Sequence, residues 1–152
     1  MNSTLQCLSQ TKDLTKYFLN PNKEGDIYNN NFASQDPNSL QLSPIYHKLV
    51  SRLWAKNGEQ SFSPNDFMNV IEQMNSLFKQ GQAGDSKDFI IFILEQFHKE
   101  LKKSVSSNNI INLEPLNQYD KNNAFVHFFN EFKNECSIIS DVFFGFTETT
   151  NV

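Results

Sequence analysis

Apolar residues recur at helical spacing along most of this chain, and polar stretches separate the periodic segments. Residues 2–19 carry apolar side chains three or four positions apart and lead to Pro21, so the pattern predicts helix up to that point. Two further amphipathic segments begin at Ser43 and Ser63, each followed by proline. Serine is a favoured N-cap and proline suits the first helical position, so both segments are predicted to be helices.

The helix that begins at Ser43 is predicted to have one apolar face and to end near Gly58. The residues of that face are Ile45, Leu49, Val50, Leu53 and Trp54. The clearest helical signal comes later, in "DSKDFIIFILEQFHKELKK". Asp85 is its predicted N-cap, Asp88 lies in its first turn and two lysines end it, which suits the helix dipole at both ends. "AFVHFFNEFKNE", residues 124–135, predicts a fifth helix.

Two polar segments and the C-terminal segment depart from this helical pattern. Residues 22–41 and 104–121 are rich in Asn and Ser with isolated apolar positions, which predicts loops. "SIISDVFFGFTETTNV", residues 137–152, combines β-branched and aromatic residues with alternating Thr, which favours a strand. The predicted fold class is therefore mainly α with a β-strand at the C-terminal end, a partial α+β domain.

Charge and cysteine usage exclude several classes of function. The formal net charge is −4, and the 13 Lys and Arg form no basic run, so neither a nucleic acid nor a membrane is expected as a partner. No apolar run approaches the roughly 20 residues that span a bilayer, and no signal peptide is recognisable. Two cysteines fit a reducing compartment, which predicts a cytoplasmic or nuclear protein.

The cysteines and histidines are expected to be structural. Cys7 lies between leucines and is interpreted as a small hydrophobe of the core, and Cys136 as a packing residue. His98 is expected to be half-buried on the long helix. His47 and His127 have no Cys or carboxylate at ligand spacing, so no metal site and no cofactor are expected.

Four segments together resemble, in sequence order, the first half of the catalytic domain of ubiquitin-specific proteases, which are cysteine-type deubiquitinases. They are "MNSTLQCLSQTKDLTKYFL", "LSPIYHKLVSRLWAKNGEQSFSPNDF", "DSKDFIIFILEQFHKEL" and "SIISDVFFGF". The resemblance implies a papain-like cysteine protease fold for residues 1–152. Residues 1–136 would form the helical thumb-like part, and residues 137–152 the start of the fingers.

The same resemblance implies that the catalytic residues lie outside this sequence. The nucleophilic cysteine would lie two residues before Met1, at a helix N-terminus that favours thiolate, and the catalytic His and its Asp or Asn partner beyond Val152. Cys7 would lie about 12 Å further along that helix and about 80° around it, so it cannot substitute. Zinc ligands of the family's fingers would also follow Val152. The chain is therefore expected to be inactive by itself.

The segment "GQAGDSKDF" resembles the family's Gln-Gln-Asp-Ala/Ser-x-Glu-Phe text, which helps to hold the extended C-terminal tail of ubiquitin. The implied tail-binding residues are Gln82, Asp85, Ser86 and Asp88. Carboxylates suit this role because the tail carries arginines and exposed N–H groups. Ala83 and Gly84 replace the family's glutamines, which is expected to weaken binding. The competing interpretation is that Asp85 and Asp88 only cap a helix, a contribution of about 1 kcal/mol.

The resemblance implies a piece of a ubiquitin carboxyl-terminal hydrolase, which performs thiol-dependent hydrolysis of the isopeptide bond at the C-terminal glycine of ubiquitin. Ubiquitin or ubiquitinated proteins would be its partners. Two alternatives remain open. One is a non-catalytic ubiquitin-binding or scaffolding remnant, and the other is an unrelated helical module whose Phe-rich faces bind a partner helix.

Overall fold

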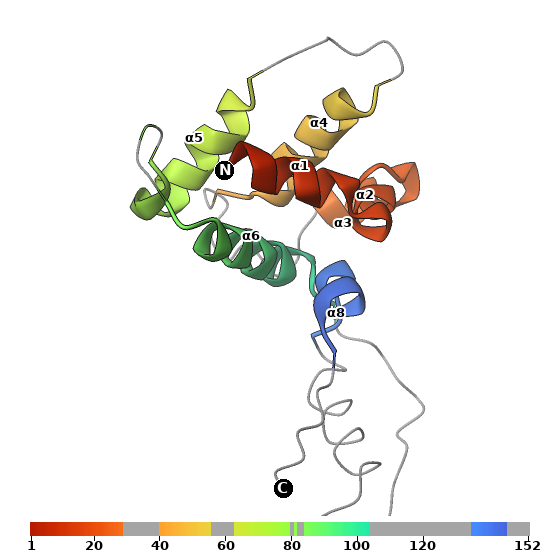
Figure 1. The fold of residues 1–152 in the computed structure, drawn as a ribbon. Helices are drawn as coiled ribbons and strands as arrows, with labels where there is room; N and C mark the ends of the chain where they lie inside the picture. Colours follow the sequence, from red (N-terminus) through yellow and green to blue (C-terminus); the bar gives the residue numbers. More distant parts are fainter. Residues whose placement is uncertain (29–39, 56–62, 80, 82–83, 104–134, 146–152) are drawn as a thin grey trace, which may run out of the picture.

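The computed structural model describes residues 1–28, 40–55, 63–79, 81, 84–103 and 135–145, and helices dominate them (Figure 1). The α-helices are α1 (Asn2–Gln10), α2 (Lys12–Phe18), α3 (Glu24–Tyr28), α4 (Ser43–Leu53), α5 (Asn65–Met74), α6 (Ser86–Leu101) and α8 (Ile138–Phe143). Two 3₁₀ helices, η1 (Pro21–Lys23) and η2 (Ser76–Phe78), join them. The mainly helical class is therefore confirmed. Within the described residues, no helix is long and apolar enough to cross a membrane.

The predicted N-terminal helical stretch consists of two helices that meet at Thr11. The backbone of Thr11 is extended, with φ −72° and ψ 101°, and its hydroxyl donates to the Cys7 carbonyl at 3.3 Å. Across the bend, the Thr15 hydroxyl donates to the Ser9 carbonyl at 2.8 Å and so satisfies a buried carbonyl at the end of α1. The bend lets both helices turn leucines into one core, where Leu8 and Leu14 are almost fully buried.

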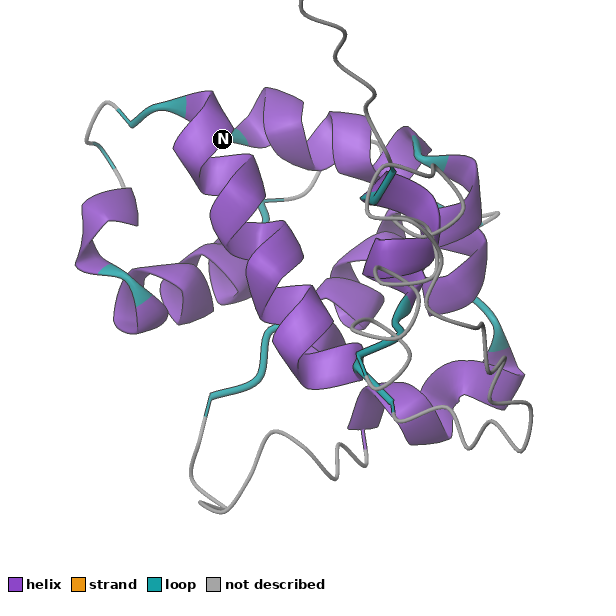
Figure 2. Ribbon diagram, turned by 90° about the horizontal axis from the view of Figure 1, so that it is seen from below, coloured by secondary structure: helices purple, strands orange, loops and turns teal. Residues whose placement is uncertain are grey.

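Helices make up most of the described residues in Figure 2, and an aromatic cluster joins α2, α4 and α6 at the centre of their core. The ring centroids of Phe18 and Tyr46 lie 4.8 Å apart, those of Tyr46 and Phe97 4.9 Å, and those of Phe18 and Phe97 5.2 Å. All three side chains are fully buried. Each such pair contributes about 0.5–1.5 kcal/mol of stability beyond the burial of its area. Contacts between large aromatic rings therefore stabilise the centre of this core.

A buried carboxylate from α6 holds the beginning of α4. Glu100 is 1% exposed, and its two oxygens accept the backbone N–H groups of Leu42 at 2.8 Å and Ser43 at 2.7 Å. The expectation that Ser43 caps this helix is wrong, because Ser43 is the first helical residue and its buried hydroxyl has no partner among the described residues. Glu100 takes over the capping role, because only an acceptor can satisfy the free N–H groups of a helix N-terminus.

Part of the predicted loop over residues 22–41 is helical. The side chain of Asn20 accepts the N–H of Asn22 at 3.0 Å and begins η1, which leads directly into α3. Ile27 is fully buried, and Asp26 forms ion pairs with Lys23 and with Lys103 at the end of α6. The buried Ile27 and the paired Asp26 thus hold α3 against the core, although the composition of this segment is polar. Residues 29–39 lie outside the described residues.

The strand predicted at the C-terminal end is wrong where it can be tested, because residues 138–143 form α8. Ser137 caps this helix: its hydroxyl accepts the N–H groups of Ile139 and Ser140, and the Ser140 hydroxyl accepts the N–H of Ser137. This capping box fixes a helical turn despite the β-branched composition. Burial of Ile139 against the core adds to it.

An isolated antiparallel bridge ties the approach to α8 to the end of α6. The N–H of Lys103 donates to the carbonyl of Cys136 at 2.8 Å. Within the described residues this bridge is the only extended pairing. The predicted loop over 104–121, most of the helix predicted over 124–135, and residues 146–152 lie outside the described residues.

Candidate functional site

The first turn of α6 brings three of the four predicted site residues together. Asp85 is the N-cap, with φ −70° and ψ 126°, and its Oδ1 accepts the N–H of Lys87 at 2.8 Å. Ser86 is the first helical residue, and Asp88 lies in the first turn. The prediction that Asp85 caps this helix is confirmed, whereas Gln82 lies outside the described residues.

The carboxylates of this turn face solvent. Asp85, Ser86 and Asp88 are all exposed. The capping bond uses Oδ1 of Asp85, and neither its Oδ2 nor the Asp88 carboxylate has a partner within the described part of the chain. Two carboxylates three positions apart on a helix are neighbours, so the turn presents a compact acidic surface with free acceptors.

Aromatic packing fixes the position of this turn. Phe89, the residue after Asp88, is fully buried, and its ring lies 5.2 Å from that of Phe78 in an edge-to-face arrangement. Phe92, one turn further, packs on the same Phe78 ring at 5.3 Å. On the other side, Gly81 has φ 82°, a conformation that side chains disfavour. Contacts of two α6 rings with Phe78 therefore anchor the helix that carries the acidic turn.

The two cysteines differ in exposure, and neither is part of the core. The interpretation of Cys7 as a core residue is wrong: Cys7 is exposed on the outer side of α1, while Leu5 and Leu8 turn inward. Helical geometry explains this. At about 100° per residue, Leu8 points about 100° away from Cys7 around the helix axis, and Leu5 about 160° away. Cys136 is partly buried. Burial is the larger cause, and the nearby Asp141 charge the smaller one, of a raised pKa of its thiol, which disfavours thiolate.

His98 is part of a polar cluster that joins α6 to α8. Its Nδ1 lies 2.8 Å from the Ser137 hydroxyl, and its Nε2 lies 3.9 Å from a Glu135 oxygen. The centroid of its ring lies 5.4 Å from that of Phe144, with the two rings tilted by 43°. The pKa of His98 is lowered, mainly because burial disfavours the charged ring. The Glu135 carboxylate opposes this shift, and the Lys102 charge adds to it. The Ser137 hydroxyl is engaged as a helix cap, so this cluster is structural.

His47 pairs with a tyrosine. Nδ1 of His47 lies 2.8 Å from the Tyr28 hydroxyl. His127 lies outside the described residues. Among those that are described, no group of three His, Cys, Asp or Glu side chains could hold a metal ion.

Two features of the surface and the core were missed by the sequence pattern. Leu53 and Trp54, predicted for the apolar face of α4, are 44% and 48% exposed, because α4 ends at Leu53 rather than near Gly58. Glu100 is buried although it is charged. Its position offered a signal, since it lies three residues after Phe97 on the buried stripe of α6.

Comparison with known proteins identifies the family. The family model described as "Ubiquitin carboxyl-terminal hydrolase" matches residues 1–152. The chain is 36% identical over 104 residues to probable ubiquitin carboxyl-terminal hydrolase 1 of Schizosaccharomyces pombe, a match that covers 68% of this chain and 12% of that protein. It is 29% identical over 153 residues to ubiquitin carboxyl-terminal hydrolase 15 of Homo sapiens, covering 100% of this chain and 15% of that protein.

The chain therefore belongs to the ubiquitin carboxyl-terminal hydrolase family, as the resemblance to ubiquitin-specific proteases predicts. A third relative, ubiquitin carboxyl-terminal hydrolase cyk-3 of Caenorhabditis elegans, is 29% identical over 106 residues, which cover 70% of this chain and 9% of that protein. The chain thus spans a small part of the length of these relatives. Family membership removes the unrelated helical module from consideration.

Proposed function

We propose that this chain is the helical thumb-like part of a deubiquitinase catalytic domain and that it binds the C-terminal tail of ubiquitin at the first turn of α6. In this proposal residues 1–136 form the thumb and residues 137–152 the start of the fingers. The proposal is supported by the family match over the whole chain and by the exposed carboxylates of Asp85 and Asp88 at the start of α6.

The observation that carries the proposal is that capping occupies only one of the two carboxylate oxygens of Asp85. One oxygen accepts the Lys87 N–H and fixes the helix start, which leaves the other free for a ligand. An arginine or a backbone N–H of the ubiquitin tail would donate to that oxygen and to Asp88. Charge-assisted hydrogen bonds of this kind are about twice as strong as neutral ones. Capping and tail binding are therefore compatible, and the two interpretations of the sequence need not compete.

The chemical step is proposed to depend on groups other than the cysteines of this chain. The raised pKa of the Cys136 thiol favours its protonated form, and Cys7 is exposed on the outer face of α1. A nucleophilic thiol needs a base or a positive environment to form thiolate. We expect no cleavage of a ubiquitin–fluorophore substrate by the 152-residue chain and no labelling of Cys7 or Cys136 by an electrophilic ubiquitin probe.

A non-catalytic ubiquitin-binding or scaffolding protein is the second candidate function. It shares the same binding surface, and it differs only in that no nucleophile acts upon the bound tail. The exposed acidic turn supports both candidates equally, so the binding test below applies to each. Two free cysteines support a cytoplasmic or nuclear location for either one.

The test separates charge from capping. Asn is as good an N-cap as Asp, so Asp85→Asn removes the charge and keeps the cap, whereas Asp85→Ala removes both. Binding of a fluorescein-labelled peptide with the ubiquitin tail sequence is measured by anisotropy. We expect Asp85→Asn to weaken binding about tenfold, the equivalent of 1.4 kcal/mol, without a change in unfolding free energy. Asp13→Asn, at an exposed position of α2, is the charge-matched control.

Equal binding by the parent chain, Asp85→Asn and Asp85→Ala would leave Asp85 as a helix cap only. A loss of binding by Asp13→Asn as large as that by Asp85→Asn would show that net charge, not the α6 turn, attracts the peptide.

A further inference from the structure

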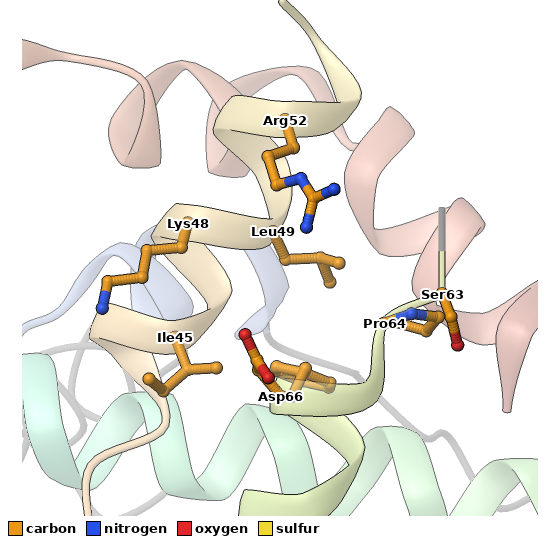
Figure 3. A pocket seen from close by; sticks show the side chains of 8 residues that line it. Ile45, Lys48, Leu49, Arg52, Ser63, Pro64 and Asp66 are labelled. Atoms are coloured by element: carbon orange, nitrogen blue, oxygen red, sulfur yellow. The ribbon is translucent and has the colours of Figure 1, made fainter. Parts of the chain in front are cut away.

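Four pockets follow one another along the surface from the start of α5, past α4 and α1, to α2, and each shares lining residues with the next. The first lies between α4 and the start of α5 (Figure 3), and it shares Leu49 and Pro64 with the second. The second continues over Leu53 and the side of α1. The third and fourth share Trp54 and extend along α1 to α2. We call this surface the α4 groove, and it uses none of the predicted tail-binding residues.

Trp54 is the apolar centre of the α4 groove. Its side chain is 48% exposed, and the neighbouring Leu53 and Leu19 are 44% and 37% exposed. The indole N–H donates to the Ser9 carbonyl at 3.2 Å, so the ring is held in place rather than free to turn inward. A fixed, half-exposed tryptophan between pockets matches the residue type and setting that dominate protein–protein interfaces.

Cations line both ends of the α4 groove. Lys48 and Arg52 line the first pocket, and Lys12 and Lys16 line the last. Among the described residues that line these two pockets, Asp66 is the only one with a carboxylate. Figure 3 shows the Arg52 guanidinium and the Asp66 carboxylate reaching into the first pocket from α4 and from α5.

The lining of the α4 groove is mostly basic, although the whole chain has a formal net charge of −4. Lys16 is paired with Asp13 at 3.3 Å, but both side chains are about three-quarters exposed, and such pairs hold their charges only weakly. A concave surface with an apolar centre and cationic ends complements a segment with an apolar residue between acidic ones. A flat membrane surface would not enter it.

We propose that the α4 groove binds an acidic segment of a partner protein, which places an apolar side chain against Trp54 and carboxylates near Lys12 and Lys48. This interaction is separate from the α6 turn, and it goes beyond the proposed binding of ubiquitin's tail. It would let one helical unit contact ubiquitin on one element and a regulator or substrate on another.

Trp54 also supplies the readout, because it is the single tryptophan of the sequence. The probe is a Trp-free amphipathic peptide of about 15 residues, with leucines on one helical face and Glu elsewhere. A second peptide has Lys in place of every Glu. We expect the acidic peptide to give a saturable blue shift of Trp54 emission and the basic peptide to give none.

Matched charge reversals locate the site. Lys12→Glu with Lys48→Glu should weaken binding of the acidic peptide about fivefold or more, whereas Lys79→Glu with Lys99→Glu changes the net charge equally and should have little effect. All four lysines are exposed. Collisional quenching of the unaltered chain gives an independent check, since a basic surrounding makes iodide a better quencher of Trp54 than caesium, relative to free tryptophan.

Three results would overturn the proposal: equal responses to the acidic and basic peptides, equal losses by the two double variants, or stronger quenching by caesium than by iodide. Vesicles of phosphatidylserine and phosphatidylcholine are tested in parallel. If they shift Trp54 emission as the acidic peptide does, the surface binds anionic lipid and the protein-segment proposal is wrong.

Discussion

Glu100 and Ser43 lie 57 positions apart in the sequence and are joined by a 2.7 Å hydrogen bond from the Ser43 backbone N–H to a Glu100 oxygen. The other oxygen of the same carboxylate accepts from Leu42 at 2.8 Å and from the side chain of Gln96 at 2.7 Å. The carboxylate thus has three donors in an almost fully buried site. It couples the helix that carries the acidic turn to the helix that lines the α4 groove.

Removal of this carboxylate should destabilise the chain strongly. Glu100→Ala leaves two buried backbone N–H groups without an acceptor, each at a cost of about 1–3 kcal/mol, so we expect a loss of about 3 kcal/mol. Denaturant unfolding measures it. Glu95→Ala, at an exposed position on the same helix, is the control and should cost little. Similar losses for both variants would mean that Glu100 contributes only helix propensity.

Tyr46 should tolerate loss of its hydroxyl. The hydroxyl is fully buried and has no hydrogen-bond partner among the described residues, so it carries a desolvation penalty without compensation. Burial also raises the pKa of Tyr46 well above its ordinary value. We expect Tyr46→Phe to stabilise the chain by about 1 kcal/mol, because the ring contacts with Phe18 and Phe97 remain.

The contrasting variant is Tyr28→Phe. The Tyr28 hydroxyl lies 2.8 Å from Nδ1 of His47, so its removal breaks a hydrogen bond and should destabilise by about 0.5–1.5 kcal/mol. Thermal unfolding of both variants decides the matter. A loss of stability in Tyr46→Phe would reveal a partner for that hydroxyl.

His98 should make stability depend on pH. The lowered pKa means that the folded chain favours the neutral ring, so its contribution is complete above the unfolded value of 6.5 and is lost as the pH falls through the folded value. The Ser137 hydroxyl already accepts two N–H groups, which leaves its own proton for Nδ1 of His98. A protonated Nδ1 would lose that bond.

The measurement is the difference in unfolding free energy between the parent chain and His98→Gln, followed from pH 8 down to pH 5. Because the variant cannot titrate at this position, the difference isolates His98 from the carboxylates. We expect the advantage of the parent chain to shrink below about pH 6.5. An advantage that grows on acidification would mean that Glu135, rather than burial, controls this histidine.

The turn that precedes the acidic site should require glycine. Gly81 has φ 82°, and an L side chain in this region costs about 1–2 kcal/mol, so Gly81→Ala is expected to destabilise by that amount. Gly25→Ala is the matched control: it lies within α3, with open space around its Cβ position, and should stabilise by about 0.5–1 kcal/mol. Equal effects of the two changes on thermal unfolding would contradict the backbone assignment.

Residues close together in the sequence were enough to predict the acidic turn, whereas contacts between residues far apart in the sequence could not be predicted. Asp85 as a cap and the extent of α6 follow from residues close in sequence, and the structure confirms both. The partner of Glu100 could not be found in this way, since it lies on another helix. The strand expected over 137–152 is wrong for residues 138–143, because the hydrogen bonds of the Ser137 capping box favour a helix there, and a count of β-branched residues does not register those bonds. Exposure of Cys7 followed from helix phase, which its leucine neighbours obscured.

The central claim, that the first turn of α6 holds the tail of ubiquitin, is tested most directly by backbone amide NMR of the labelled chain during titration with ubiquitin. The account predicts progressive shifts for the amides of Asp85, Ser86 and Asp88, which disappear when the ubiquitin added lacks its C-terminal tail. Asp85→Asn should reduce these shifts while the spectrum of the helical core stays the same. Shifts that persist with tail-less ubiquitin, or a titration that leaves these amides unmoved, would contradict the claim.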